Sequence, residues 1–95
     1  MNYVTNKFTL DDVNSVATMS TVFVERITEE EFKKVETFSS LVSDSYTAKE
    51  LQRLLGKFVP TNTKPEFNLK EGDKLFVASR NKGKFTFHKV SVRYL

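Results

Sequence analysis

Apolar and polar residues alternate along three stretches of the chain, and this period of two predicts strands because successive strand side chains point to opposite faces. The stretches are residues 2–8 (NYVTNKF), 18–27 (TMSTVFVERI) and 85–94 (FTFHKVSVRY). In the last one the apolar positions change phase between Phe87 and Val90. The change predicts either a bulge near His88 and Lys89 or a strand that is buried on both faces.

Shorter segments between these stretches also have strand character. Residues 37–42 are expected to form a strand that leads into a helix. Residues 67–69 and 75–79 flank a Glu-Gly-Asp turn, which predicts a hairpin. A second tight connection at residues 80–84 (RNKGK) contains three basic residues and joins this hairpin to the last strand.

Two capping-box motifs predict where helices begin. Thr28 is followed three residues later by Glu31, and Thr47 by Glu50. In this motif the hydroxyl accepts from an early helix amide while the carboxylate reaches back to the amide of the capping residue. The first helix is expected to run to about Val35.

The second helix has a clear apolar face and a clear end. Gly56 stands where a left-handed C-terminal cap is expected, because glycine adopts a positive φ without steric cost. The apolar residues before it share one face at helical spacing: Ala48, Leu51, Leu54 and Leu55.

The order of these elements predicts an α+β fold for a single small domain of residues 1–95. We expect a mixed, mostly antiparallel sheet with the helices packed on one face. The other face of the sheet, or one of its edges, is then available for a partner. Residues 10–17 are left open between a loop and one helical turn capped at Thr9.

Charge and composition narrow the function classes. Fifteen Lys and Arg against twelve Asp and Glu give a net charge of +3, which tolerates a polyanion but falls short of a nucleic-acid signature. The chain has no cysteine, so it has neither disulfides nor a thiolate metal site. This composition and the absence of a charged-then-apolar leader favour an intracellular protein. No apolar run is long enough to span a bilayer, and no motif predicts a metal or a cofactor.

The turn at residues 43–46 (SDSY) is the first candidate site. It precedes the second helix, whose positive end and unpaired amides favour an anion such as phosphate. The simpler alternative is that Ser45 or Thr47 only caps the helix. The three glutamates at 29–31 fit a solvated first helical turn, and the lone histidine, His88, fits a structural or surface role better than catalysis.

Taken together, several short motifs resemble a known family, the small viral domain of the type III anti-CRISPR ring nucleases from archaeal viruses, phages and mobile elements. Each motif is weak alone, but their order and spacing match over nearly the whole chain. They are residues 6–10 (NKFTL), 42–48 (VSDSYTA), 54–56 (LLG), 59–62 (VPTN) and 72–73 (GD) with Leu75 and Val77. The resemblance implies a homodimer that binds cyclic tetraadenylate across its interface, in the host cytoplasm, as a counter-defence protein.

The resemblance also implies a mechanism that this chain lacks. In the family a ribose 2′-hydroxyl attacks the neighbouring phosphodiester without a metal, and a histidine in a Gly-His motif protonates the departing 5′-oxygen. Here Ser43 and Asp44 occupy those two positions. An ionised aspartate cannot donate that proton, and a placed acid is worth about a hundred- to ten-thousand-fold in rate. We therefore expect no catalytic residue.

What remains of the family site predicts binding. In the family an Asn-Arg pair follows the Val-Pro motif and a longer insertion carries a glutamine and an arginine, whereas here Thr63 follows Asn62 and the connection is short. The expected ligand-binding residues are Asn6, Thr9, Ser43, Asp44, Ser45, Thr47, Asn62 and Arg80.

Four hypotheses follow. The first is a protein that binds a cyclic oligonucleotide signal without cutting it, and the second is a fold reused to bind and inhibit a host protein. The third is a residual ring nuclease in which another group, conceivably His88, supplies the proton. The fourth is nucleic-acid binding through residues 80–84 and Arg93, which Asp44 and the acidic helix start partly oppose.

Overall fold

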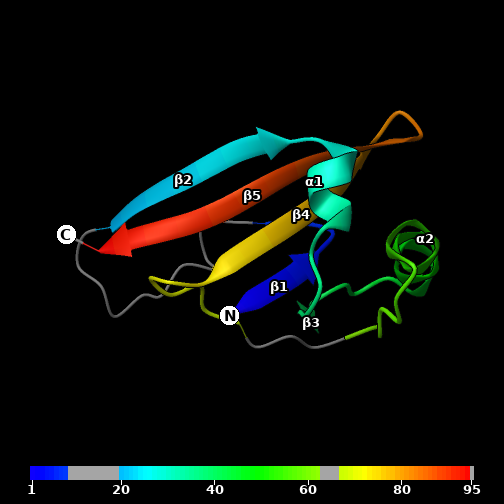
Figure 1. The fold of residues 1–95 in the computed structure, drawn as a ribbon, viewed down its shortest axis with the longest axis horizontal. Coiled ribbons are helices and arrows are strands. Elements are labelled where there is room, and N and C mark those ends of the chain that lie inside the picture. Colours follow the sequence, from blue (N-terminus) through cyan, green and yellow to red (C-terminus); the bar gives the residue numbers. More distant parts are fainter. Residues whose placement is uncertain (9–19, 63–66, 95) are drawn as a thin grey trace.

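The computed structural model describes residues 1–8, 20–62 and 67–94. Its five strands and two helices follow the predicted order, except that the strand expected at residues 67–69 is absent (Figure 1). Residues 9–19, and with them the helical turn considered at 10–17, lie outside the described ranges, as do residues 63–66. The elements are β1 (Asn2–Thr5), β2 (Ser20–Ile27), α1 (Glu29–Lys33), β3 (Ser39–Ser40), α2 (Ser45–Leu55), β4 (Lys74–Asn81) and β5 (Lys84–Tyr94).

All five strands belong to one mixed sheet with the order β2-β5-β4-β1-β3. The long strand β5 pairs antiparallel with both β2 and β4, whereas β1 pairs parallel with β4 and with β3. The parallel pairings are short, since β1 has four residues and β3 has two. The fold is therefore α+β with a mixed sheet that is mostly antiparallel, as predicted.

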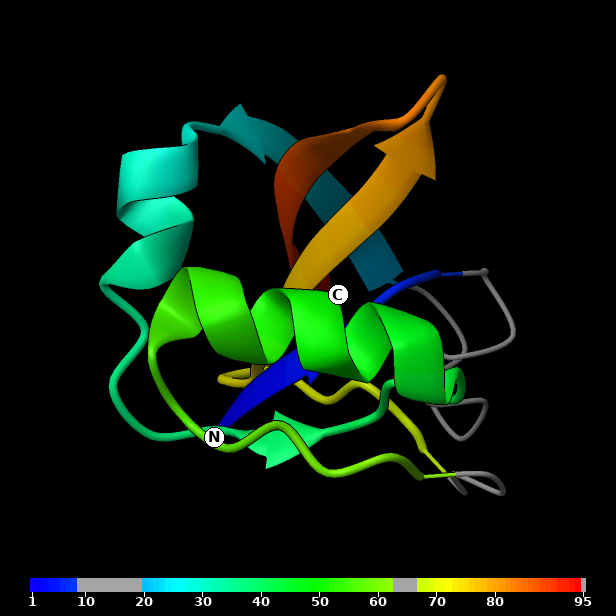
Figure 2. The same ribbon diagram turned by 90° about the vertical axis from the view of Figure 1, so that its right-hand side faces the viewer.

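Both helices cover the same face of the sheet. Figure 2 shows α2 lying across the sheet in front of β1, with α1 beside its C-terminal end. Phe32 from α1 and Leu51 from α2 are fully buried and belong to one cluster with Val4, Phe76 and Phe87 of the strands. This cluster is the main core, and it fixes α2 over the parallel side of the sheet.

The change of phase along β5 has a simple cause, because this strand is buried on both faces. Phe87 belongs to the helix-side core, where its ring lies 4.7 Å from that of Phe32. Val90 and Val92 belong to a second cluster with Leu69 on the opposite face. The pairing with β2 and β4 continues in register through His88 and Lys89, so the second of the two alternatives is confirmed and the bulge is wrong.

Three strand predictions differ from the structure: one hairpin is absent and two strands are shorter than expected. The hairpin between residues 67–69 and 75–79 does not form, because β4 already has β1 and β5 as its two neighbours. Leu69 is instead a buried residue of the second cluster. The first strand ends at Thr5 rather than at residue 8. The Thr5 hydroxyl donates to the carbonyl of Lys7 and accepts from the amide of Lys7. The strand predicted at 37–42 is reduced to Ser39–Ser40.

Neither helix in the described part of the chain combines the length and the hydropathy that crossing a bilayer requires.

Candidate binding site at the start of α2

The candidate site lies where the parallel strands end. β1, β3 and β4 run in the same direction, so their carboxyl ends meet at one edge of the sheet. The chain passes from β3 through residues 41–44 into α2 at this edge. Crevices at the carboxyl ends of parallel strands are common ligand sites in α/β sheets, so the side chains gathered here are candidate ligand contacts.

Asp44, and not Thr47, caps α2. The helix begins at Ser45, and Asp44 has the extended backbone of a capping residue. One oxygen of its carboxylate accepts from the amide of Tyr46 at 3.3 Å, and the other accepts from the amide of Thr47 at 3.2 Å. The hydroxyl of Thr47 donates to the same carboxylate at 2.6 Å. The predicted capping box at Thr47 is therefore wrong, since its hydroxyl serves Asp44 instead.

These contacts keep Asp44 ionised. The hydrogen bond from the Thr47 hydroxyl lowers the pKa of the Asp44 carboxyl most, and the amides of Thr47 and Tyr46 and the charge of Arg80 lower it further. The slight loss of hydration acts in the opposite direction and is outweighed. A lowered pKa favours the charged form of the Asp44 carboxyl. Its carboxylate also occupies the amides that an anionic ligand would need.

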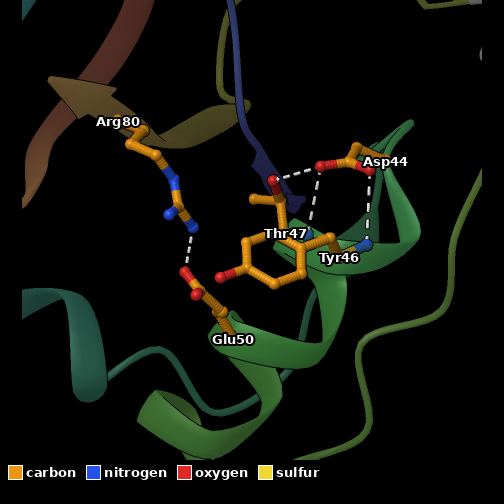
Figure 3. A network of polar contacts seen from close by, with 5 residues as sticks. All are labelled: Asp44, Tyr46, Thr47, Glu50 and Arg80. Atoms are coloured by element: carbon orange, nitrogen blue, oxygen red, sulfur yellow. Dashed lines mark hydrogen bonds and ion pairs between the residues drawn. The ribbon is translucent and has the colours of Figure 1, made fainter. Parts of the chain in front are cut away.

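Arg80 is held on three sides. Its guanidinium forms an ion pair with Glu50 of α2, and it lies 5.1 Å from the ring centroids of both Tyr46 and Phe85. Figure 3 shows Arg80 reaching from β4 towards Glu50, with the Tyr46 ring beside it. Glu50 thus binds Arg80 instead of closing a capping box, and the charge of Arg80 is largely compensated within the protein.

The other predicted ligand residues are placed unequally. Asn6 follows the end of β1 at the same sheet edge, and its buried Oδ1 has no hydrogen-bond partner in the described structure. Ser43 is half-buried before the cap, and Ser45 is exposed. The backbone amide of Asn62 donates to the carbonyl of Val42 at 2.7 Å, which brings its loop beside the start of α2. Thr9 lies outside the described residues.

His88 is not part of this site. In β5 it stands opposite Val77 of β4 and Arg26 of β2. Paired residues share a face of the sheet, and Val77 belongs to the cluster on the face away from both helices. The structure therefore does not bring His88 to Asp44 within one chain. In residues 1–8, 20–62 and 67–94, no three His, Asp or Glu side chains gather to hold a metal ion.

A groove beside α2 was missed by the sequence analysis. It has a volume of about 270 Å³, lies between α2 and residues 58–61, and is lined by Ser45, Ala48, Lys49, Gln52 and residues 58–61. The Gln52 side chain accepts from the amide of Val59 at 3.3 Å and fixes this segment against the helix. Phe58 is 75% exposed at the groove. The usable signal was an aromatic residue two positions after the glycine cap.

The border of the groove is basic. Lys49 lines it, and Arg53 follows one helical turn later. Both side chains are exposed, and neither takes part in the ion pairs found within the described ranges. The groove therefore combines an exposed aromatic ring with the positive charge of Lys49, and Arg53 lies one helical turn further along α2.

A scan of the sequence against protein-family models and a search of curated proteins found no match.

Proposed function

We propose that this protein is a noncatalytic binding protein whose target is another protein, on a scaffold that resembles the ring nucleases. The observation that carries the proposal is the Asp44 carboxylate, which accepts hydrogen bonds from two amides at the start of α2 and from the Thr47 hydroxyl. A ligand phosphate would have to displace a group of its own charge that is already well bound. Binding to a protein does not meet this obstacle.

The charges around the cap support the same choice. Asp44 and Glu50 contribute two negative charges, and Arg80 contributes one positive charge that Glu50 already binds. A cyclic oligonucleotide carries one negative charge for each phosphate, and Asp44, Glu50 and Arg80 together offer it one net negative charge. Within one chain, His88 lies on the other face of the sheet, which weighs against His88 as the acid of residual cleavage.

The groove beside α2 is the surface that we assign to the partner protein. Exposed aromatic side chains are frequent anchors in protein interfaces, and Phe58 is such a side chain. Lys49 and Arg53 favour an acidic partner, because opposite charges steer association and suppress wrong partners. The resemblance of the motifs supports the proposed setting, which is a counter-defence protein in the cytoplasm of a host cell.

The first test is a calorimetric titration with cyclic tetraadenylate, followed by recovery of the nucleotide. We expect no heat of binding and an intact ring. Asp44→His is the matched variant, because it restores the residue type that the resembling family uses as its acid. If wild type binds tightly, or if Asp44→His cleaves the ring, the site has kept its ligand and the protein-binding proposal is wrong.

The second test compares capture of host proteins by wild type and two variants. Phe58→Ser combined with Lys49→Glu changes the groove, and Lys33→Ala changes an exposed residue of α1 as the control. We expect one partner to be retained by wild type and by the control, and to be lost with the groove variant. Equal retention by all three would place the partner elsewhere on the surface and contradict the assignment of the groove.

A further inference from the structure

The sheet ends at β2 in a long strand with one neighbour. Among the described strands, β2 pairs only with β5 through Ser20–Ile27, and it lies at the opposite end of the sheet from the two-residue strand β3 (Figure 1). An edge strand presents a row of backbone amides and carbonyls that can pair with another chain, and natural proteins usually protect such edges with charges, bulges or very short strands. The regular pairing of β2 with β5 leaves an eight-residue edge without a bulge.

The middle of this edge is apolar and exposed. Phe23 is 45% exposed and Val24 is 58% exposed. The two side chains point to opposite faces because they are neighbours in a strand. Charged residues follow only at Glu25 and Arg26, and Lys89 of β5 already binds the Glu25 carboxylate at 3.8 Å. Within the described residues, the outer edge of β2 is therefore unpaired, and the strand carries apolar surface on both faces.

We propose that β2 pairs antiparallel with β2 of a second copy of this chain, in a register that places Phe23 opposite Phe23. In this register Val22 faces Val24, Thr21 faces Glu25 and Ser20 faces Arg26. Each apolar residue thus meets an apolar residue, and each charged residue meets a hydroxyl. The result is a two-fold symmetric dimer in which the five-stranded sheets join into one sheet of ten strands.

Charge selects this register over its neighbours. A pairing centred on Glu25 would set that carboxylate against its own copy, and like charges directly opposite are destabilising. A pairing centred on Val24 would set Glu25 against Phe23 and Arg26 against Val22, so both charges would lose water without gaining a partner. The register centred on Phe23 avoids both costs. The pattern of β2 is self-complementary, which favours a second copy over an unrelated strand.

The pairing of two copies is independent of the partner protein proposed for the groove, because β2 and α2 lie at different ends of the sheet. The mass of the protein in solution should therefore approach twice that of one chain as its concentration rises. Phe23→Lys should place two positive charges opposite each other and raise the dissociation constant of the dimer about tenfold or more. Phe58→Lys is the control, since it introduces the same charge at an exposed aromatic residue away from β2.

A cysteine variant tests the register directly. The chain has no cysteine, so Phe23→Cys introduces a single thiol that faces its own copy at a distance suited to a disulfide. We expect mild oxidation to give a covalent dimer with Phe23→Cys and none with Phe58→Cys. In addition, an equal mixture of Phe23→Lys and Phe23→Glu should form a dimer that neither variant forms alone.

Several results would overturn the proposal. A wild type that stays monomeric at all concentrations in sedimentation equilibrium would exclude the dimer. A dimer that survives in Phe23→Lys, with the circular dichroism of wild type, would place the interface elsewhere. Failure of the Lys and Glu variants to associate, while wild type dimerises, would show that residue 23 does not face itself.

Discussion

The start of α2 and the edge strand β2 differ in whether their side chains have partners within the chain. At α2 the polar residues that looked like a ligand site bind one another: Asp44 takes two amides and the Thr47 hydroxyl, and Glu50 takes Arg80. At β2 an alternating pattern that looked like an ordinary half-buried strand leaves Phe23 and Val24 on the surface. The polar residues of a motif can therefore satisfy one another without a ligand. In this protein, exposed apolar side chains are the better guide to a surface that binds a partner.

The two regions should differ most in how much a truncated side chain lowers the free energy of unfolding, because one side chain is buried and the other is exposed. Leu51 of α2 is fully buried and Val24 of β2 is 58% exposed. Leu51→Ala should lower the free energy of unfolding by about 2–5 kcal/mol through lost contacts and a residual cavity. Val24→Ala should change it by about 0.5 kcal/mol or less. Urea unfolding of both variants in the Phe23→Lys background excludes any effect of dimerisation. A loss at Val24 as large as that at Leu51 would mean that Val24 is covered within the single chain.

The same comparison shows which features local sequence patterns could predict. The box at Thr28 and Glu31 is present as predicted, with the Thr28 hydroxyl accepting from the amide of Glu31 at 3.2 Å. The box at Thr47 failed because Asp44, three residues earlier, is a stronger cap than threonine. The spacing of a motif does not rank two competing caps, so the helix begins three residues earlier than a cap at Thr47 predicts.

Long-range pairing was the other source of error. A Gly-Asp turn between two apolar segments normally predicts a hairpin, but the edge of β4 that residues 67–69 would need is taken by β1. Almost seventy residues separate β1 from β4, and no local pattern carries that information. The exposure of β2 has the same origin, since alternation reports a strand without reporting its place in the sheet. The predicted α+β class is confirmed, because this prediction depends on the order of the elements alone.

Removing the cap should convert the start of α2 into the open site that the sequence suggested. Asp44→Ala leaves the amides of Tyr46 and Thr47 without their acceptor, so the melting temperature should fall. Inorganic phosphate should restore part of the loss in this variant, because anions bind free amides at helix starts. It should have little effect on wild type. Differential scanning fluorimetry in chloride and in phosphate measures both, and equal phosphate effects on the two proteins would show that Asp44 does not block the amides.

Acid should weaken α2 through the same carboxylate. The pKa of Asp44 in the folded protein lies below its ordinary value of 3.8, so its contribution to stability is present above that value and is lost as the pH falls through the lower folded pKa. Asp44→Asn keeps a good capping side chain without a titrating group. The stability of wild type should therefore fall more steeply than that of Asp44→Asn below about pH 4. Parallel curves in urea unfolding from pH 6 to pH 2.5 would contradict the assigned hydrogen bonds.

The smallest effect on stability is expected at the ion pair between Glu50 and Arg80. This pair tests whether Glu50 keeps Arg80 from binding an anion. Both side chains are partly exposed, at 28% and 37%, so their coupling should amount to about 0.2–1 kcal/mol and weaken with salt. A double-mutant cycle with Glu50→Gln and Arg80→Gln measures it. Arg80→Lys separates charge from stacking, because lysine lacks the planar group that lies beside Tyr46 and Phe85. If Glu50→Gln frees Arg80 for phosphate and creates anion binding that wild type lacks, then Glu50 and not Asp44 closes the site.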